Sequence, residues 1–357
     1  MARNHWIYRS VMIFPVLWVL GAYLGGWYHY LTLILGYLII PLADLISGPR
    51  PWNVSPDEAI SLRRQKSYDT VLFLYAPVVT GLMIWAAYFA STVPMALTEW
   101  IGFTLSSGLI SGAIGMTIAH ELCHRKDFLS GLCARGILIH VCYMHFVIEH
   151  VYGHHVKIAT PEDPATARKG ESLYQFIIRS VFGGLKSAWS IECHRLKKLN
   201  LSPYSVKNQM IWFAIVPFLF FSGLCMAFGP VAGLFFIIQA MVGFSYLEVI
   251  NYVEHYGLLR KKNAKGRYEK ISPQHSWNSD HRVSVYLLFG LPNHSDHHAN
   301  ADRPYQILRS VPDAPQLPFS YPVMVTLAFF PGIWRKLMDH RVDQLNAAPG
   351  PASANRI

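Results

Sequence analysis

Six long apolar stretches constrain this chain more than any other feature of its sequence. A helix needs about twenty apolar residues to cross the hydrocarbon core of a bilayer. The composition agrees, since 52% of the residues are hydrophobic and only 15% are charged, against roughly a quarter charged in a soluble domain. We therefore predict six membrane-spanning helices, at approximately residues 10–27, 29–48, 69–91, 95–119, 209–229 and 231–252.

Lysine and arginine are confined to one end of these predicted helices. The short connections at 25–28, 91–94 and 228–230 contain neither residue. A charged side chain at mid-bilayer costs about 2.5–3.5 kcal/mol, and cytoplasmic segments carry the excess of positive charge. We therefore expect both termini and the segments 120–208 and 253–357 to be cytoplasmic. The net charge of +10 then reflects topology rather than a nucleic-acid-binding face. The basic residues nearest the first spans are Arg3, Arg9, Arg50, Arg63, Arg64 and Lys66.

The predicted fold is all-α, an integral membrane six-helix bundle with a cytoplasmic, helical, histidine-rich region. Four spans and a cytoplasmic loop occupy 1–119, and the histidine-rich region occupies 120–208. Two further spans follow at 209–252, then a second histidine-rich region at 253–346. The end of the chain, 347–357, has the composition of a disordered tail. None of the five cysteines forms a CxxC pair, which excludes a zinc ribbon or a rubredoxin-like iron site.

Nine of the 17 histidines gather in four short motifs near predicted helix ends. The motifs read HELCH from residue 120, EHVYGHH from 149, NYVEHYG from 251 and HSDHH from 294. A spacing of four residues places two imidazoles on one helix face, where they can share a metal. His120 and His124 have this spacing, and His150 and His154 repeat it. The candidate metal ligands are His120, His124, His150, His154, His155, His255, His294, His297 and His298.

Nine imidazoles exceed what one ion holds in a four- to six-coordinate site, so the motifs predict two metals. Imidazole suits iron, copper, zinc and nickel alike, and the spacing leaves the metal's identity open. Ligating histidines usually donate their second ring N–H to a carboxylate. The acidic candidates for that role, any of which could also bind a metal directly, are Glu121, Glu149, Glu254 and Asp296.

Two other functions share part of this pattern. HExxH alone marks zinc proteases, in which the glutamate would be the general base. A protease would not require the seven histidines of the other three motifs. A metal transporter would carry histidines inside its spans, whereas here they collect at one end. The remaining histidines, including His140, His145 and His275, are interpreted as structural.

In this order after paired spans, HELCHR, EHVYGHH, NYVEHYGL and HSDHHA resemble the motifs of AlkB-type alkane monooxygenases, within the membrane fatty acid desaturase and hydroxylase superfamily. The segments Ala159-Thr-Pro-Glu-Asp-Pro-Ala165 and Ser276-Trp-Asn-Ser279 resemble the same family, and the likeness covers roughly residues 10–335. The NYVEHYG motif is the specific element, because desaturases lack it. The chain departs from the family at Leu291-Pro292-Asn293, Cys123 and Arg125.

This resemblance implies a six-helix enzyme of the bacterial inner membrane with a non-haem di-iron centre, which the nine histidines would hold. It implies O2 and electrons from rubredoxin and its reductase, and oxidation of the terminal methyl of a medium-chain alkane to a primary alcohol. Zinc has no redox chemistry for such a step. Relatives that hydroxylate the methyl groups of xylene or cymene, fed by a ferredoxin-type reductase, share these motifs and are the alternative. A fatty acyl desaturase is a further alternative.

Overall fold

The computed structural model describes residues 4–49 and 53–347. Within these ranges the chain is helical, and its β-structure is limited to three isolated bridges. The all-α prediction is therefore confirmed. Arg3, Arg50 and positions 348–357 of the predicted disordered tail lie outside the described residues.

Six apolar helices are long enough to cross a membrane, as the sequence predicts. Helices α1 (His5–Arg9) and α2 (Ile13–Leu24), joined by η1 (Ser10–Met12), make the first. The second runs through η2 (Gly26–Tyr30), α3 (Leu31–Ile34), η3 (Leu35–Ile39) and α4 (Ile40–Ser47), and the third through η4 (Lys66–Tyr68) and α6 (Asp69–Thr92). The fourth joins α7 (Leu97–Leu109), η5 (Ile110–Ile114) and α8 (Gly115–Cys123); the last two are α13 (Gln209–Phe228) and α14 (Pro230–His255).

The ends of these helices differ from the predicted ends by a few residues. The fourth and sixth spans each continue about a turn further than hydropathy indicates, so that His120 and His255 belong to their last turns. At the opposite ends, the hairpins turn at Gly25 (φ 69°) and Gly229 (φ 86°). A positive φ of this kind is unfavourable for residues with a Cβ, which is why glycine closes both turns.

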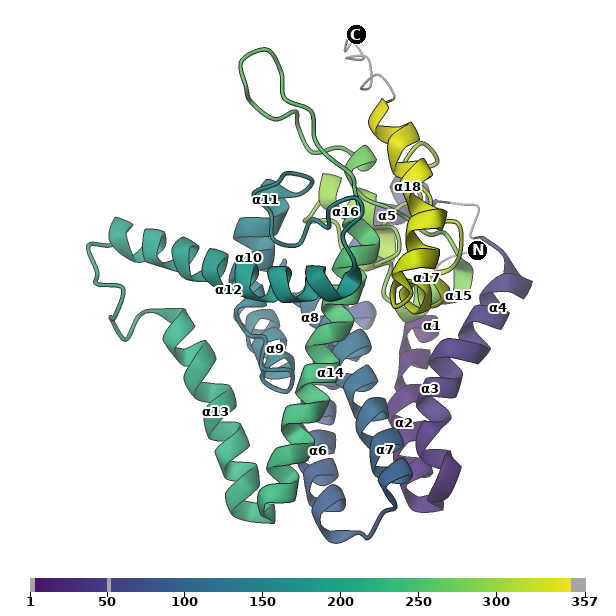
Figure 1. Cartoon of the computed structure of the whole chain (residues 1–357), viewed down its shortest axis with the longest axis vertical. Coiled ribbons are helices and arrows are strands. Elements are labelled where there is room, and N and C mark those ends of the chain that lie inside the picture. Colours follow the sequence, from purple (N-terminus) through teal and green to yellow (C-terminus); the bar gives the residue numbers. More distant parts are fainter. Residues whose placement is uncertain (1–3, 50–52, 348–357) are drawn as a thin grey trace.

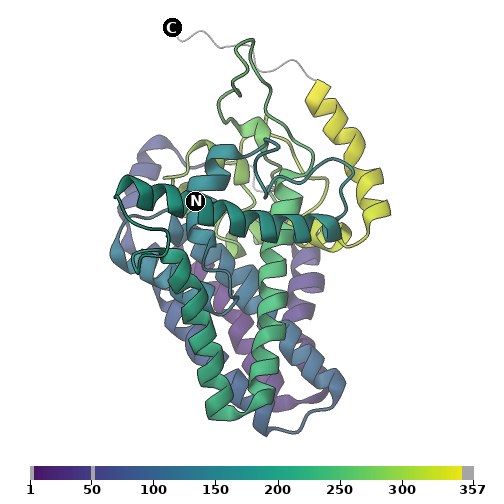
Figure 2. The same ribbon diagram turned by 60° about the vertical axis from the view of Figure 1, so that its left-hand side comes forward.

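The six spans form a bundle, and the remaining helices cover one end of it (Figure 1). Helix α14 lies within the bundle and packs against α6, α7, η5 and α13. Helix α12 (Leu173–Lys198) lies across the end of the spans, as both views show (Figures 1 and 2). Helix α9 (Phe128–Ile139) is the exception, since it packs beside the spans against α8 and α6. The other covering elements are α5 (Pro56–Arg64), α10 (Phe146–Glu149), η6 (His150–His154), α11 (His155–Lys157), η7 (Pro273–His275), α15 (Arg282–Leu287), α16 (His294–Ala299), η8 (Tyr305–Ile307), α17 (Tyr321–Ala328) and α18 (Pro331–Ala347). We call this the covered end.

Glycines allow the fourth and sixth spans to approach each other closely. A Cβ placed on Gly112 would lie 2.5 Å from the carbonyl oxygen of Gly243 and 2.6 Å from its Cα. Between membrane helices, small residues let backbones come together and maximise van der Waals contact. This contact holds η5 against α14, and both of these spans carry histidines at their covered ends.

We predict that Gly112→Ala lowers the thermal stability of the detergent-solubilised protein. The added methyl group meets backbone, which cannot rotate away, and overpacking of this kind costs about 1–3 kcal/mol. Gly81→Ala in α6 is the matched control, since a Cβ there meets nothing within 4 Å. Equal melting temperatures for the two variants would contradict the close approach.

Candidate metal centre

All nine histidines singled out by the sequence converge at the covered end, and they form two groups. The ligand atoms of each group lie within 4.8 Å of one another. The first group contains His120, His124, His150, His155 and His297. The second group contains His154, His255, His294 and His298.

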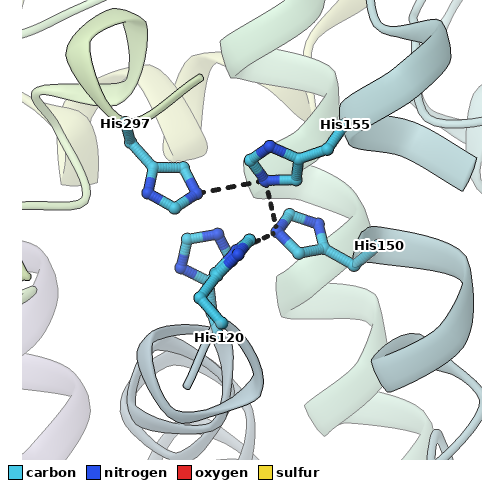
Figure 3. A group of neighbouring side chains, drawn as sticks. His120, His150, His155 and His297 are labelled. Atoms are coloured by element: carbon cyan, nitrogen blue, oxygen red, sulfur yellow. Dashed lines mark hydrogen bonds between the residues drawn. The ribbon is translucent and has the colours of Figure 1, made fainter. Parts of the chain in front are cut away.

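In the first group the Nε2 atoms point toward a common centre (Figure 3). The Nε2 atom of His150 is 3.1 Å from that of His124 and 3.0 Å from that of His155, which is 3.2 Å from that of His297. The Nε2 atom of His120 is buried and has no hydrogen-bond partner. Helices from three separate parts of the chain, α8, η6–α11 and α16, supply these rings.

The second group repeats this arrangement with four fully buried rings. The Nε2 atom of His298 is 2.9 Å from that of His294 and 3.3 Å from that of His154. The Nε2 atoms of His294 and His255 are 3.2 Å apart. The rings come from η6, the end of α14 and α16, so η6 and α16 each contribute to both groups.

A π-helical turn explains how one short segment serves two groups. In η6 the N–H of His155 donates to the carbonyl of His150, five residues earlier. This widened turn places His150 and His155 in the first group and directs His154 into the second. The four-residue spacing of an α-helix had instead suggested that His150 and His154 share a metal. His120 with His124, and His294 with His298, do follow that spacing.

Burial keeps six of the rings outside the spans neutral, and His154 is the exception described below. It lowers the pKa of His124 to about 4, with the neighbouring His154 adding to the effect. Burial, and then nearby histidines, hold the pKa values of His150, His155, His294, His297 and His298 well below the ordinary value. At neutral pH these imidazoles therefore keep a lone pair, which is the form that binds a metal.

The spacing of the nitrogens fits one metal ion in each group. Imidazole nitrogens bound to one first-row metal lie about 2.0–2.1 Å from it, so neighbouring ligand nitrogens are about 2.8–3.4 Å apart. The Nε2 separations of 2.9–3.3 Å match this range. The Nε2 atom of His120 is buried and has no hydrogen-bond partner. A metal ion bound among these closely spaced rings would give it one.

Asp163 holds one of the rings, and the sequence reasoning did not select it. Its Oδ2 accepts a hydrogen bond of 2.8 Å from Nδ1–H of His154, which leaves Nε2 facing the second group. Burial acts to lower the pKa of His154, but the Asp163 carboxylate raises it above the ordinary value. Asp163 lies between the histidine motifs in sequence, within the segment 159–165. The resemblance of that segment to the alkane monooxygenase family was the one sequence feature that could have identified Asp163.

The four predicted acidic residues have different surroundings. Glu254 contacts a ring directly, since its Oε2 is 3.1 Å from Nε2 of His294 and its Oε1 accepts a hydrogen bond from Tyr321. Glu149 is buried and lines a cavity with His150 and His154, one ring of each group, and burial raises its pKa to about 8. Glu121 instead accepts hydrogen bonds from Arg125, and Asp296 accepts them from Arg303. Both carboxylates neutralise arginines at the edge of the site.

The histidines interpreted as structural lie outside the two groups. The Nε2 atom of His140 is 2.9 Å from the Thr80 hydroxyl, and His275 is bonded to Ser272 and Glu269. His145 lines a small polar cavity with Glu149 and Glu248.

Two apolar cavities that share Ile250 as a lining residue lie between the spans and the histidines. The larger of these two lies between the second, fourth and sixth spans and is lined by Tyr37, Leu109, Tyr246 and other, mostly apolar residues. Tyr37 and Tyr246 also border a wider opening with Leu33 and Phe329, on the outside of the bundle. Ile250 lines both the large cavity and a smaller one that reaches His120, His150 and His294. The smaller cavity therefore borders both histidine groups.

Comparisons with known proteins agree with this architecture. A family model described as fatty acid desaturase matches residues 97–328. Alkane 1-monooxygenase 2 of Pseudomonas aeruginosa is 38% identical over 350 residues, which cover 95% of this chain and 91% of the relative. Alkane 1-monooxygenase 1 of Alcanivorax borkumensis is 40% identical over 343 residues, covering 94% and 85%. The xylene/toluene monooxygenase hydroxylase component of Pseudomonas putida is 27% identical over 355 residues, covering 96% and 91%.

We predict that Asp163→Asn weakens metal binding by roughly 10–100-fold, the usual effect of losing a carboxylate that orients a ligand histidine. Iron retained per chain, measured across a series of chelator concentrations, reports the change. Glu162→Gln removes a neighbouring but exposed carboxylate and should leave retention unchanged. Equal retention in both variants would show that Asp163 does not support a metal ligand.

Proposed function

The chain belongs to the fatty acid desaturase family, and from this premise we propose that it is a membrane monooxygenase that hydroxylates the terminal methyl group of medium-chain alkanes. The product would be a primary alcohol, with O2 as oxidant. The observation that carries the proposal is the meeting of an apolar cavity within the spans and two groups of histidines at its end. Alkane 1-monooxygenases that are 38% and 40% identical over nearly the whole chain support it.

We assign one iron to each histidine group. The five imidazoles of the first group would hold one ion and the four of the second group the other. When bound, a pair of irons supplies the redox chemistry that attack on an unactivated C–H bond requires and that zinc lacks. Glu254, 3.1 Å from Nε2 of His294, is the carboxylate best placed to join the second group as a ligand.

The protein's own residues would bind and orient the hydrocarbon. Burial of a methylene group gives about 0.8 kcal/mol, so an eight-carbon chain gains several kcal/mol without a polar anchor. Tyr37 and Tyr246, whose rings stack with centroids 6.5 Å apart, lie where the chain would enter from the lipid. Ile250 lies where its end would pass toward the histidines. The apolar walls also exclude water from the reacting methyl group.

The multi-pass chain would reside in the bacterial inner membrane, with its covered end and both termini in the cytoplasm. The confinement of Lys and Arg to the covered side of the spans supports this orientation. Electrons would come from rubredoxin or a ferredoxin-type protein with its reductase, since the covered end faces the aqueous compartment where such carriers occur.

A methyl hydroxylase of alkylbenzenes is the second candidate. Its support is the relative of the xylene and toluene type, at 27% identity. A fatty acyl desaturase has weaker support, because the NYVEHYG segment around His255 is absent from desaturases.

The substrate can be tested with whole cells that express the chain. Given octane, xylene and a fatty acid together, they should form 1-octanol as the main product. Methylbenzyl alcohol as the main product would favour the second candidate, and an unsaturated fatty acid would identify a desaturase. A His120→Ala variant should remain in the membrane but form none of these products. Full turnover by that variant would overturn the proposed metal centre.

The position of Ile250 gives a second test. Ile250→Trp should fill space in both cavities that Ile250 lines and abolish octane hydroxylation, while iron content stays that of the unmodified protein. Leu234→Trp is the control, because Leu234 on α14 is exposed on the outside of the bundle. Unchanged octane turnover in the Ile250 variant would mean that the substrate takes another route.

A further inference from the structure

A short hairpin at the covered end carries the densest run of positive charge in the chain. Residues 260–270 read RKKNAKGRYEK, with six Lys and Arg against one Glu. The two arms pair at an antiparallel bridge between Lys262 and Tyr268. We call this segment the basic hairpin.

The basic hairpin has a defined turn. Asn263 accepts hydrogen bonds at its Oδ1 from the backbone N–H groups of Lys265 and Arg267, at 2.9 and 3.1 Å. Gly266, with φ 71°, supplies the conformation that the turn requires and donates to the Asn263 carbonyl. The basic side chains are therefore presented on a fixed backbone rather than on an irregular loop.

The positive charge of the hairpin faces outward. Glu269, its one acidic residue, is directed to the base, where Oε1 accepts from the backbone N–H of Lys261 and lies 3.2 Å from His275. The side chain of Lys262 lies over the Tyr268 ring, 4.8 Å from its centroid. The exposed cationic residues of the hairpin are Lys261, Lys262, Lys265, Arg267 and Lys270.

The hairpin projects from the covered end, away from the six spans (Figures 1 and 2). In both views the spans extend in the opposite direction, so a membrane around them does not reach the turn. Lipid headgroups therefore cannot be its partner. By contrast, the exposed Lys186, Lys197 and Lys198 belong to α12, which lies across the ends of the spans, where anionic headgroups would be.

One arm of the hairpin connects to His154 through a continuous series of hydrogen bonds. The N–H of Arg260 donates to the carbonyl of Ala159 at 2.7 Å, and the N–H of Ala159 donates to the Thr166 hydroxyl at 2.9 Å. That hydroxyl donates to Asp163 at 2.6 Å, and Asp163 accepts from His154. Electrons transfer faster through covalent bonds and hydrogen bonds than across the same distance of empty space.

The other arm reaches the same histidine group. After His275 the chain continues to Trp277, whose N–H donates to the carbonyl of Glu254 and whose indole N–H donates to the carbonyl of Tyr256, both at 2.9 Å. These two acceptors flank His255. Both arms of the hairpin are thus anchored beside the second histidine group.

We propose that the basic hairpin is the docking site of an acidic, one-electron carrier protein, and that electrons enter the centre at the second histidine group. The proposal rests on the proposed function, because a monooxygenase needs two electrons and two protons with each O2 to form the alcohol and water. Two reduced carriers would dock in turn, and each would lose one electron to the iron at His154, His255, His294 and His298.

The binding test uses the full chain in bilayer discs and an acidic rubredoxin as the probe. Reversal of three charges, Lys262→Glu with Lys265→Glu and Arg267→Glu, should raise the Kd for rubredoxin at least about tenfold at low salt, since complementary charge speeds association by about 10–1,000-fold. The matched control reverses three charges on α12, Lys186→Glu with Lys197→Glu and Lys198→Glu, and should leave Kd unchanged. This measurement requires neither turnover nor iron.

Turnover separates the docking surface from the proposed function. With rubredoxin and its reductase, the hairpin variant should lose at least about tenfold in kcat/KM for rubredoxin. With dithionite and methyl viologen, which need no docking site, it should form as much 1-octanol as the unmodified protein. Failure of the unmodified protein with both reductants would count against the hydroxylase function, while rubredoxin binding would still test the hairpin.

Two outcomes would overturn the proposal. One is an unchanged Kd in the hairpin variant, or a larger loss of binding in the α12 variant. The other is an equal loss of turnover with rubredoxin and with viologen, which would mean that the hairpin supports the centre's structure rather than a carrier.

Discussion

The burial of nine imidazoles at one end of a membrane bundle is the constraint on which the rest of the structure depends. A buried polar group without a partner costs free energy comparable to a lost hydrogen bond or more. Here the Nε2 atoms of four separate segments face one another at about the spacing of ligands on one ion. Two metals would satisfy these groups together, and the packing of η5 against α14 through Gly112 and Gly243 brings the fourth and sixth spans, which carry two of the segments, into place.

The architecture could be predicted from the sequence because its cause is strong and local. Each charged residue in the bilayer core would raise the free energy of insertion by about 2.5–3.5 kcal/mol. Hydropathy and the placement of Lys and Arg therefore indicate six spans, and the structure has six helices of that kind. The nine candidate ligands could also be selected, because helical spacing within each motif is short-range. The expected domain limits, the orientation in the membrane and the metals themselves remain predictions.

Other features could not be read from spacing alone. The division of His150, His154 and His155 between the two groups depends on a π-helical turn, and the regular period of an α-helix does not anticipate it. The contacts of Asp163 with His154, and of Tyr321 with Glu254, depend on how distant segments fold together. Glu121 and Arg125, by contrast, are four residues apart on one helix, a spacing that predicts their ion pair. Asp296 and Arg303 are seven residues apart, and their contact depends on the fold of the segment between them.

The two sides of the centre differ in chemistry, and this difference organises the proposed reaction. Apolar cavities bounded by Tyr37, Tyr246 and Ile250 approach from the spans, while hydrogen-bonded segments and the basic hairpin approach from the covered end. A hydrocarbon and an electron carrier could therefore reach the same pair of irons from opposite directions without competing for one surface.

The most direct test of the central claim is to locate the metals, with an anomalous diffraction map recorded at the iron absorption edge from crystals of iron-loaded protein. The account predicts two peaks in each chain, one inside each histidine group. A single peak, or signal only at the zinc edge, would contradict it.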